Sequence, residues 1–232
     1  SIFYDNIMMG TQLLHEAKNS NIEKFITLGT VCSYPKFASI PFSENEIWDG
    51  FPDESNAAYG ISKKMMLVQS HVYRQQYGFN SISVIPTNLY GPEDDFNIET
   101  SNVVPGIILK ISNAVKTNSN EVVLWGDGSP TRDFLFVDDA ADGIILAAQK
   151  YDDASPINLG AQKETSIKEL AMLISEIMKF SGNIIWDDTK ANGQPRRCVS
   201  NYKAEREIGF KPKISLKEGL IKVISWFESN YG

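Results

Sequence analysis

The chain has 232 residues, and 22 lysines and arginines against 29 aspartates and glutamates give it a formal net charge of −7. Hydrophobic residues make up 42% and charged residues 22%, a balance typical of folded proteins that excludes a disordered or collagen-like chain. The acidic balance argues against general binding to nucleic acid or to a membrane surface. No apolar run approaches the roughly 18 residues of a membrane-spanning helix, so we expect no membrane partner.

Cysteine and histidine are scarce. Cys32 and Cys198 are too few for a disulfide scaffold and suit a reducing compartment, so we expect a cytoplasmic location. With only His15 and His71 beside them, we expect no metal site. The acidic run 93–95 lacks the spacing of a calcium loop, and a solvated loop is the simpler interpretation.

The apolar pattern of the first part predicts, in chain order, a helix near the start, a strand at 24–28, a loop over 33–56, a helix over 60–77 and a strand at 81–85. The long helix has Ile61, Met65, Val68 and Val72 on one face, and Gly78 ends it. This strand–helix–strand order predicts a parallel sheet with a crossover helix.

The second part predicts a helix over 103–115, a strand at 122–125, a glycine-rich turn at 126–130, a strand at 134–137, a helix over 139–150, a strand at 157–159 and two further helices. Each of these last two helices has a capping box, formed by Ser166 with Glu169 and by Ser215 with Glu218.

Tyr59 and Lys63 are four residues apart on the long predicted helix, so their side chains point the same way. An ammonium beside a phenol favours the phenolate, so we expect Lys63 to lower the pKa of Tyr59 from about 10. Such a tyrosine exchanges a proton at neutral pH, which suits the interconversion of a carbonyl and an alcohol. Taken alone, the pair is better explained as two residues on a solvated helix face.

The context of this pair is more informative than the pair itself. Thr30 follows the first predicted strand, at the end where open parallel sheets place their sites. Its hydroxyl could bond the substrate oxygen that Tyr59 protonates. The next strand ends in Pro86-Thr87-Asn88-Leu89, at the same edge of the sheet.

These segments resemble the extended short-chain dehydrogenase/reductase family, on residues 28–35, 56–64, 86–92 and 132–139. Within it they are similar to the GDP-L-fucose synthase group, on residues 31–36, 74–79, 125–130 and 192–197. The similarity extends over essentially the whole chain. It implies a Rossmann-type doubly wound parallel sheet with a smaller, interleaved substrate domain, and it divides the chain into a dinucleotide-binding part (1–92 and 134–160) and a substrate part (93–133 and 161–232).

The family places a glycine-rich phosphate loop on its first strand–helix turn, and this sequence has no such motif. The chain also begins at Ser1 rather than at a methionine. We therefore expect a chain that lacks roughly 80 residues and the first strands of the sheet. The remaining sheet would have an exposed edge.

The resemblance implies an NADP-dependent enzyme that epimerises GDP-4-keto-6-deoxy-D-mannose on both sides of its ketone and then reduces the ketone to give GDP-L-fucose. It implies Thr30, Tyr59 and Lys63 as the reductase triad, with Tyr59 as proton donor, and Cys32 as an epimerisation residue. Without the resemblance, Cys32 could equally be a small buried side chain, and Cys198 is interpreted as packing. The family's second epimerisation residue is a histidine, where this chain has Asn102, which exchanges no proton near neutral pH.

The implied cofactor contacts are Leu28, Gly29, Thr30, Val31, Tyr59, Lys63, Pro86, Thr87, Asn88, Leu89 and Asn102. The implied contacts with the GDP-linked deoxyhexose are Asn88, Lys110, Trp125, Arg132, Asn192 and Arg197. Without the resemblance, each of these cations could be an ordinary surface charge. Lys110 replaces an arginine of the family pattern and so lacks the bidentate fork. The family also implies a homodimer.

Asn102 leaves three interpretations open. The chain could be a complete epimerase and reductase, or a GDP-sugar 4-reductase or 4-epimerase without full 3,5-epimerase activity. A non-catalytic relative that senses a nucleotide is the third, and the intact Thr30, Tyr59 and Lys63 oppose it.

Overall fold

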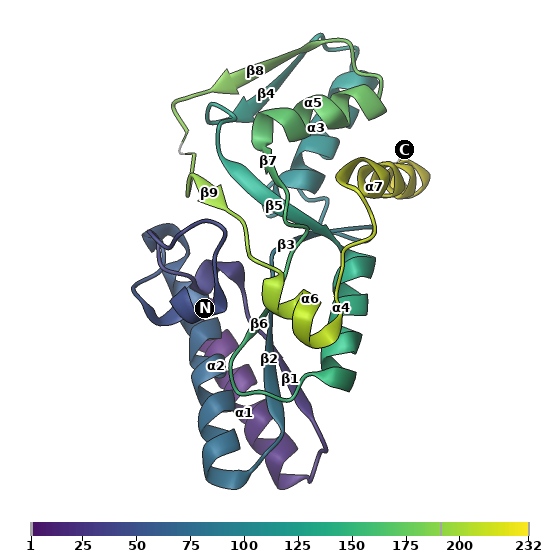
Figure 1. The fold of residues 1–232 in the computed structure, drawn as a ribbon. Helices are drawn as coiled ribbons and strands as arrows, with labels where there is room; N and C mark the ends of the chain where they lie inside the picture. Colours follow the sequence, from purple (N-terminus) through teal and green to yellow (C-terminus); the bar gives the residue numbers. More distant parts are fainter. Residues whose placement is uncertain (1, 191, 232) are drawn as a thin grey trace.

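The computed structural model describes residues 2–190 and 192–231, which form two lobes along one long axis (Figure 1). The lower lobe in that view has a parallel sheet with the order β1–β2–β6, formed by Phe25–Leu28, Ser81–Pro86 and Ile157–Leu159. Helices α1 (Ile2–Asn19) and α2 (Ala57–Tyr77) lie on one side of this sheet, and α4 (Val137–Lys150) and α6 (Tyr202–Ile208) lie on the other. The expected Rossmann-type arrangement is therefore confirmed, with β1 at one edge of the sheet.

The upper lobe is built around β5 (Thr131–Phe136), which pairs in parallel with β3 (Asn88–Tyr90) and β9 (Arg196–Arg197) and antiparallel with β7 (Glu164–Ser166). A separate parallel pair joins β4 (Glu121–Trp125) to β8 (Asn183–Asp187). The helices of this lobe are α3 (Val103–Lys116), α5 (Ile167–Ile177) and α7 (Leu216–Tyr231). Short 3-10 helices η1 (Val31–Ser33), η2 (Glu44–Trp48) and η3 (Glu54–Asn56) interrupt the loop between β1 and α2.

The buried apolar side chains around the lower sheet come from segments that are far apart in the sequence. Ile82, Val84 and Ile157 from the sheet pack with Ile208 and Phe210, all less than 2% exposed. Burying each such side chain stabilises the fold by about 1.5–3 kcal/mol. Residues near 208 therefore pack with the dinucleotide-binding part, although the sequence assigned residues 161–232 to the substrate part.

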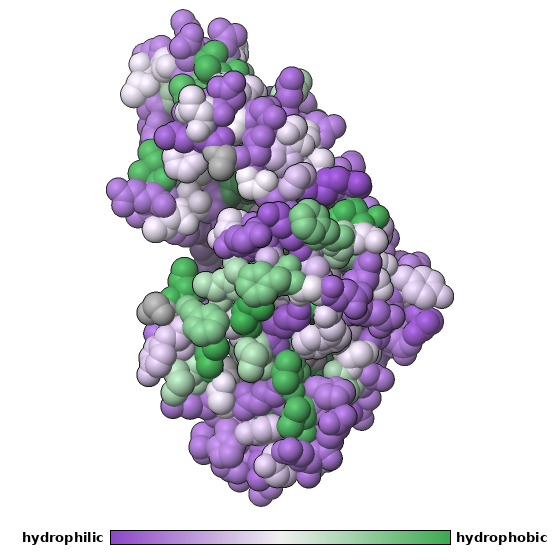
Figure 2. All heavy atoms as spheres, turned by 90° about the vertical axis from the view of Figure 1, so that its left-hand side faces the viewer, coloured by the Kyte–Doolittle hydropathy of each residue, from purple (hydrophilic) through white to green (hydrophobic). Residues whose placement is uncertain are grey.

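Helix α2 carries the predicted tyrosine–lysine pair and ends at Gly78, whose φ of 61° is the left-handed conformation that glycine adopts most easily. The face that packs inward carries Met66 and Leu67. Two residues of the apolar stripe seen in the sequence face outward, because Met65 is 49% and Val68 is 38% exposed, while Ile61 and Val72 are half-buried. Figure 2 shows apolar surface on this side of the lower lobe.

Both predicted capping boxes are confirmed: the Ser166 and Ser215 hydroxyls accept from the backbone N–H groups of Glu169 and Glu218, and each glutamate accepts from its serine's N–H. Strand β5 begins at Thr131 rather than Phe134. The short elements β3, β7, β8, β9 and α6 were not predicted, because segments of two to seven residues carry little periodic pattern.

Candidate active site

Thr30 occupies the end of β1 that the sequence analysis expected. Its backbone is extended (φ −149°, ψ 146°), and its hydroxyl caps η1 by accepting from the Cys32 N–H at 3.2 Å. The Tyr59 phenol lies near enough to the Thr30 hydroxyl for Thr30 to lower the pKa of the phenol. The bond from the Cys32 N–H holds the Thr30 hydroxyl in place on the side of the site where Tyr59 lies.

Close packing of α2 against η1 brings the two elements together. A Cβ at Gly60 would lie 2.3 Å from the Cys32 carbonyl oxygen, so only glycine allows this approach. The Ser33 hydroxyl donates to the Gly60 carbonyl at 2.9 Å and holds the first turn of the helix in place. Tyr59, Thr30 and Cys32 consequently share one corner of the lower lobe.

The pKa of Tyr59 differs from the expectation. Burial raises the pKa of the Tyr59 phenol, and the charge of Cys32 raises it further, while the hydrogen bond with Thr30 lowers it. Lys63 is not among the groups that shift it, so the predicted lowering by the ammonium is wrong for this structure. A raised pKa keeps Tyr59 protonated at neutral pH, and a protonated phenol can act as an acid.

Lys63 is partly buried one turn further along α2, and burial lowers the pKa of its ammonium. Among the described residues, no hydrogen bond or ion pair engages this side chain. An unpaired and partly desolvated cation one helical turn from the Tyr59 phenol suits a ligand rich in hydroxyl oxygens. This donor set fits the ribose and nicotinamide end of a dinucleotide. The exposed Leu28 lies at the end of β1, and the exposed Leu89 is the middle residue of β3.

Cys32 is partly exposed and lies beside two arginines. The Arg197 Nη1 donates to the Cys32 Sγ at 3.4 Å, and the Arg197 Nε donates to the Gln194 Oε1 at 2.7 Å. Arg132 is a further cation near this sulfur: burial and the neighbouring Arg197 lower the pKa of its guanidinium to about 10, and the charge of Cys32 opposes that shift. The structure thus brings together Cys32, Arg132 and Arg197, which the sequence had assigned to two different roles.

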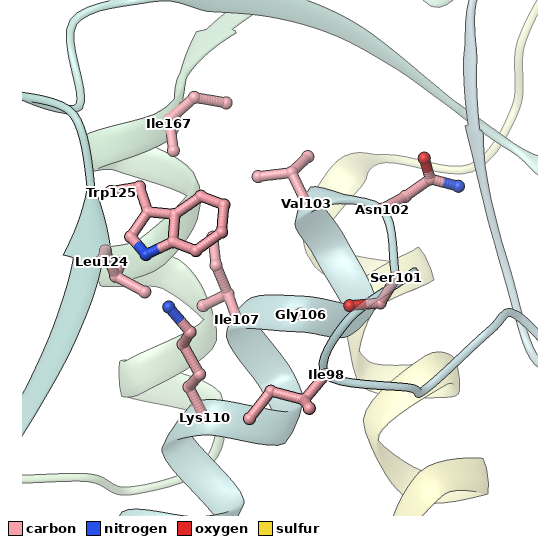
Figure 3. Close-up of a pocket in the computed structure, with 10 residues that line it drawn as sticks. All are labelled: Ile98, Ser101, Asn102, Val103, Gly106, Ile107, Lys110, Leu124, Trp125 and Ile167. Carbon is pink, nitrogen blue, oxygen red and sulfur yellow. The ribbon is translucent and has the colours of Figure 1, made fainter. Parts of the chain in front are cut away.

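A cavity of about 230 Å³ opens at the start of α3 (Figure 3). Lys110 and Trp125 line it, and the Lys110 ammonium lies 5.3 Å from the centre of a Trp125 ring that is 68% exposed. The same ammonium donates to the Val123 carbonyl at 2.9 Å. Asn102 also borders the cavity, but its side chain points away from Lys110 and Trp125 in Figure 3.

Several other predicted residues have their side chains engaged within the protein. The Thr87 hydroxyl and the Asn88 amide both donate to the Asp133 carbonyl, at 3.0 and 2.9 Å. Asn192 Oδ1 accepts from the Asp127 N–H at 2.9 Å and so ties the loop before β9 to the turn after β4. Gly29, Val31 and Pro86 are buried at the ends of β1 and β2.

Sequence reasoning missed Gln194 and Asp53. Gln194 is only 6% exposed and holds Arg197, while Asp53 contributes a negative charge near Arg132 and Arg197. The signal for Gln194 was its place in the segment 192–197, which carried the resemblance but received no role for this residue. Asp53 lies in an acidic loop with no distinguishing pattern.

Two general searches complete the description of residues 2–190 and 192–231. They contain no cluster of three or more histidine, cysteine, aspartate or glutamate side chains arranged to hold a metal ion. Their helices include none with the length and apolar character needed to cross a bilayer.

Comparison with known proteins agrees with this geometry. Residues 1–160 match the NAD dependent epimerase/dehydratase family. The chain is 41% identical over 226 residues to "Probable GDP-L-fucose synthase 1" of Oryza sativa subsp. japonica, covering 97% of this chain and 69% of that protein. It is 34% identical to the GDP-L-fucose synthase of Escherichia coli K12, covering 98% of this chain and 73% of that one.

A solved structure shows the same fold. The crystal structure of a GDP-L-fucose synthetase from Naegleria fowleri bound to NADP superposes with a TM-score of 0.90 at 31% identity, covering 98% of this chain and 73% of that one. The chain therefore belongs to the NAD dependent epimerase/dehydratase family, in the group of the GDP-L-fucose synthases.

Proposed function

We propose that this chain is an NADP-dependent epimerase and reductase that forms GDP-L-fucose from GDP-4-keto-6-deoxy-D-mannose. The observation that carries the proposal is the placement of the Thr30 hydroxyl beside the Tyr59 phenol, with Lys63 one turn further along the helix, in a chain of this family. When bound, NADPH supplies the hydride that reduces the sugar ketone. Every other part of the step falls to side chains of this chain.

Tyr59 gives its phenolic proton to the ketone oxygen as that oxygen gains negative charge. Its raised pKa keeps the proton in place until the carbonyl needs it. Thr30 lies beside the phenol in the free protein and turns its hydroxyl proton to the same ketone oxygen once the sugar is bound, and Lys63 presents its ammonium to the ribose side of the cofactor. We propose that Arg132 binds the negative charge of the nucleotide and that Trp125 packs against its base.

Cys32 is the proposed base for epimerisation. Its thiolate takes a proton from a carbon next to the ketone: the C–H bond breaks, an S–H bond forms, and the electron pair moves onto the ketone oxygen as an enolate. Inversion of the carbon needs a second proton delivered to the opposite face, which in this proposal comes from solvent water. In this chain the second position holds Asn102, whose amide supplies no proton.

Asn102 supports a second candidate function, a GDP-sugar 4-reductase with weakened epimerase activity. The two functions are separated by assaying the full-length gene product with GDP-4-keto-6-deoxy-D-mannose. NADPH oxidation measures reduction, and deuterium uptake from heavy water at C3 and C5 without NADPH measures epimerisation. Oxidation with uptake at both carbons supports the first function, oxidation without uptake supports the second, and no oxidation contradicts both.

The homodimer and the cytoplasmic location are also proposals. The exposed Met65 and Val68 of α2, with Met9 and Leu13 of α1, give the lower lobe an apolar surface that a second copy would cover. The two free cysteines favour a reducing compartment. Light scattering of Met65→Glu/Val68→Glu tests the dimer: a monomer is expected, and an unchanged mass would contradict the proposed surface.

A further inference from the structure

The Arg197 guanidinium is buried without a carboxylate partner. It is only 7% exposed, and no ion pair joins it to an acidic side chain among the described residues. Its hydrogen-bond partners are the neutral Gln194 Oε1 at 2.7 Å and the Cys32 Sγ at 3.4 Å. A buried cation is costly unless an anion faces it, and of these two partners only the sulfur can become one.

Gln194 sets the direction in which this cation points. It is 6% exposed, and its Nε2 donates to the Lys36 carbonyl at 3.4 Å while its Oε1 accepts from the Arg197 Nε. With Nε held in this way, the planar guanidinium turns its Nη1 toward Cys32. The chain of contacts therefore runs from backbone to amide to guanidinium to sulfur.

The charges around Cys32 favour an anion at this sulfur. Arg197 faces it from β9 and Arg132 from β5, while Tyr59 approaches from α2 and is neutral when protonated. Asp53, from the loop before η3, is the opposing charge, and it is itself held by Ser55 and lies 3.8 Å from the Lys36 ammonium.

We propose that Arg197, oriented by Gln194, is a positioning residue that stabilises the Cys32 thiolate. This differs from the direct substrate contact expected for Arg197. The proton leaves the thiol for solvent, and the charge-assisted hydrogen bond from Nη1 holds the anion that remains. The use of that thiolate as a base at the sugar rests on the proposed function, but the pairing itself does not.

The test measures iodoacetamide alkylation of the Cys32 peptide by mass spectrometry, near pH 7 and at about pH 10. Only the thiolate reacts, so Arg197→Gln is expected to slow alkylation about tenfold near pH 7. At about pH 10, well above the usual range of protein thiols, the rates should converge. The matched control is Arg196→Gln, which removes the same charge from an exposed neighbour paired with Glu164; its rates should equal those of the unmodified chain.

An equal slowing of Arg197→Gln at both pH values, or the same slowing in Arg196→Gln, would overturn the proposal. If Arg197→Gln fails to fold by circular dichroism, Arg197→Lys decides. Lysine keeps the charge but cannot reach Gln194 and Cys32 at once, so we expect alkylation of Cys32 to slow about threefold, and only at the lower pH. If alkylation of Arg197→Lys did not slow, the proposed pairing of Arg197 with the Cys32 thiolate would be contradicted. If the alkylation rates behave as expected but the sugar takes up no deuterium, the result counts against the proposed epimerisation and not against the pairing of Arg197 with Cys32.

Discussion

At the corner between β1 and α2, Thr30 and Tyr59 lie beside each other, whereas at the start of α3 Asn102 borders the cavity but its side chain points away from Lys110 and Trp125. The first region has the groups that a carbonyl reduction needs. The second has an amide, Asn102, at the position that we propose for the proton donor of epimerisation.

The difference comes from how each region is held. The corner is fixed by backbone contacts, because Gly60 lets α2 lie against the Cys32 carbonyl and Ser33 bonds the Gly60 carbonyl. The side chain of Asn102 is exposed and forms no cap with the first turn of α3, as far as the described residues show. A residue so loosely engaged can change without cost to the fold, so reduction should be more robust in this chain than epimerisation.

The largest effect is expected from a substitution at the corner between β1 and α2. Tyr59→Phe removes the proton donor, and reduction by the full-length gene product should fall by roughly 10²–10⁴-fold with no loss of folding. NADPH oxidation with the keto sugar measures it. Tyr77→Phe is the matched control, since this exposed tyrosine at the end of the same helix should leave the rate unchanged. A Tyr59→Phe protein that keeps more than about a tenth of the rate would mean that another acid serves.

A second substitution adds a titratable side chain at the start of α3. Asn102→His supplies a group that titrates near neutral pH, and deuterium uptake at C3 and C5 should rise by about tenfold to a hundredfold. Because Asn102 caps nothing, the melting temperature should stay the same. Asn102→Gln keeps an amide and should give no increase. An unmodified chain that already exchanges as fast as Asn102→His would show that this position is not limiting.

The third prediction acts on the packing behind the corner. In Gly60→Ala the added Cβ meets the Cys32 carbonyl, so α2 has to move away from η1. We expect a loss of stability of about 1–3 kcal/mol and roughly tenfold slower reduction, because Tyr59 leaves Thr30. Urea unfolding and NADPH oxidation measure the two effects. Gly78→Ala, at the end of the helix where no atom lies within 4 Å of the new Cβ, should lower stability through its positive φ but leave the catalytic rate intact.

The sequence predicted those parts of the fold in which local pattern and long-range packing agree. The long helices, the parallel order of β1 and β2 and the two capping boxes all follow from periodicity and from short-range bonding. The outward stripe of Met65 and Val68 shows where pattern fails, because an apolar face does not say whether a core or a second molecule covers it.

For the candidate site, residue types and order led to Thr30, Tyr59 and Lys63 but not to their electrostatics. The spacing of Tyr59 and Lys63 suggested a lowered phenol pKa, and burial together with Cys32 raises it instead. The contact of Arg197 with Cys32 joins residues 165 positions apart. Such a contact depends on how β9 is placed against η1, which no local pattern records.

The smallest expected effect separates these contributions to the Tyr59 pKa. The hydrogen bond with Thr30 lowers that pKa, whereas burial and the charge of Cys32 raise it. Thr30→Val removes only the lowering contribution, so the phenol keeps its proton to a higher pH and the alkaline limb of kcat/KM should move upward, by less than about one pH unit. Thr30→Ser keeps the hydroxyl and should leave the limb in place. If the alkaline limb of kcat/KM moved to lower pH in Thr30→Val, the hydrogen bond with Thr30 would stabilise the protonated phenol rather than the phenolate. Thr30 would then act on the substrate oxygen and not through the pKa of Tyr59.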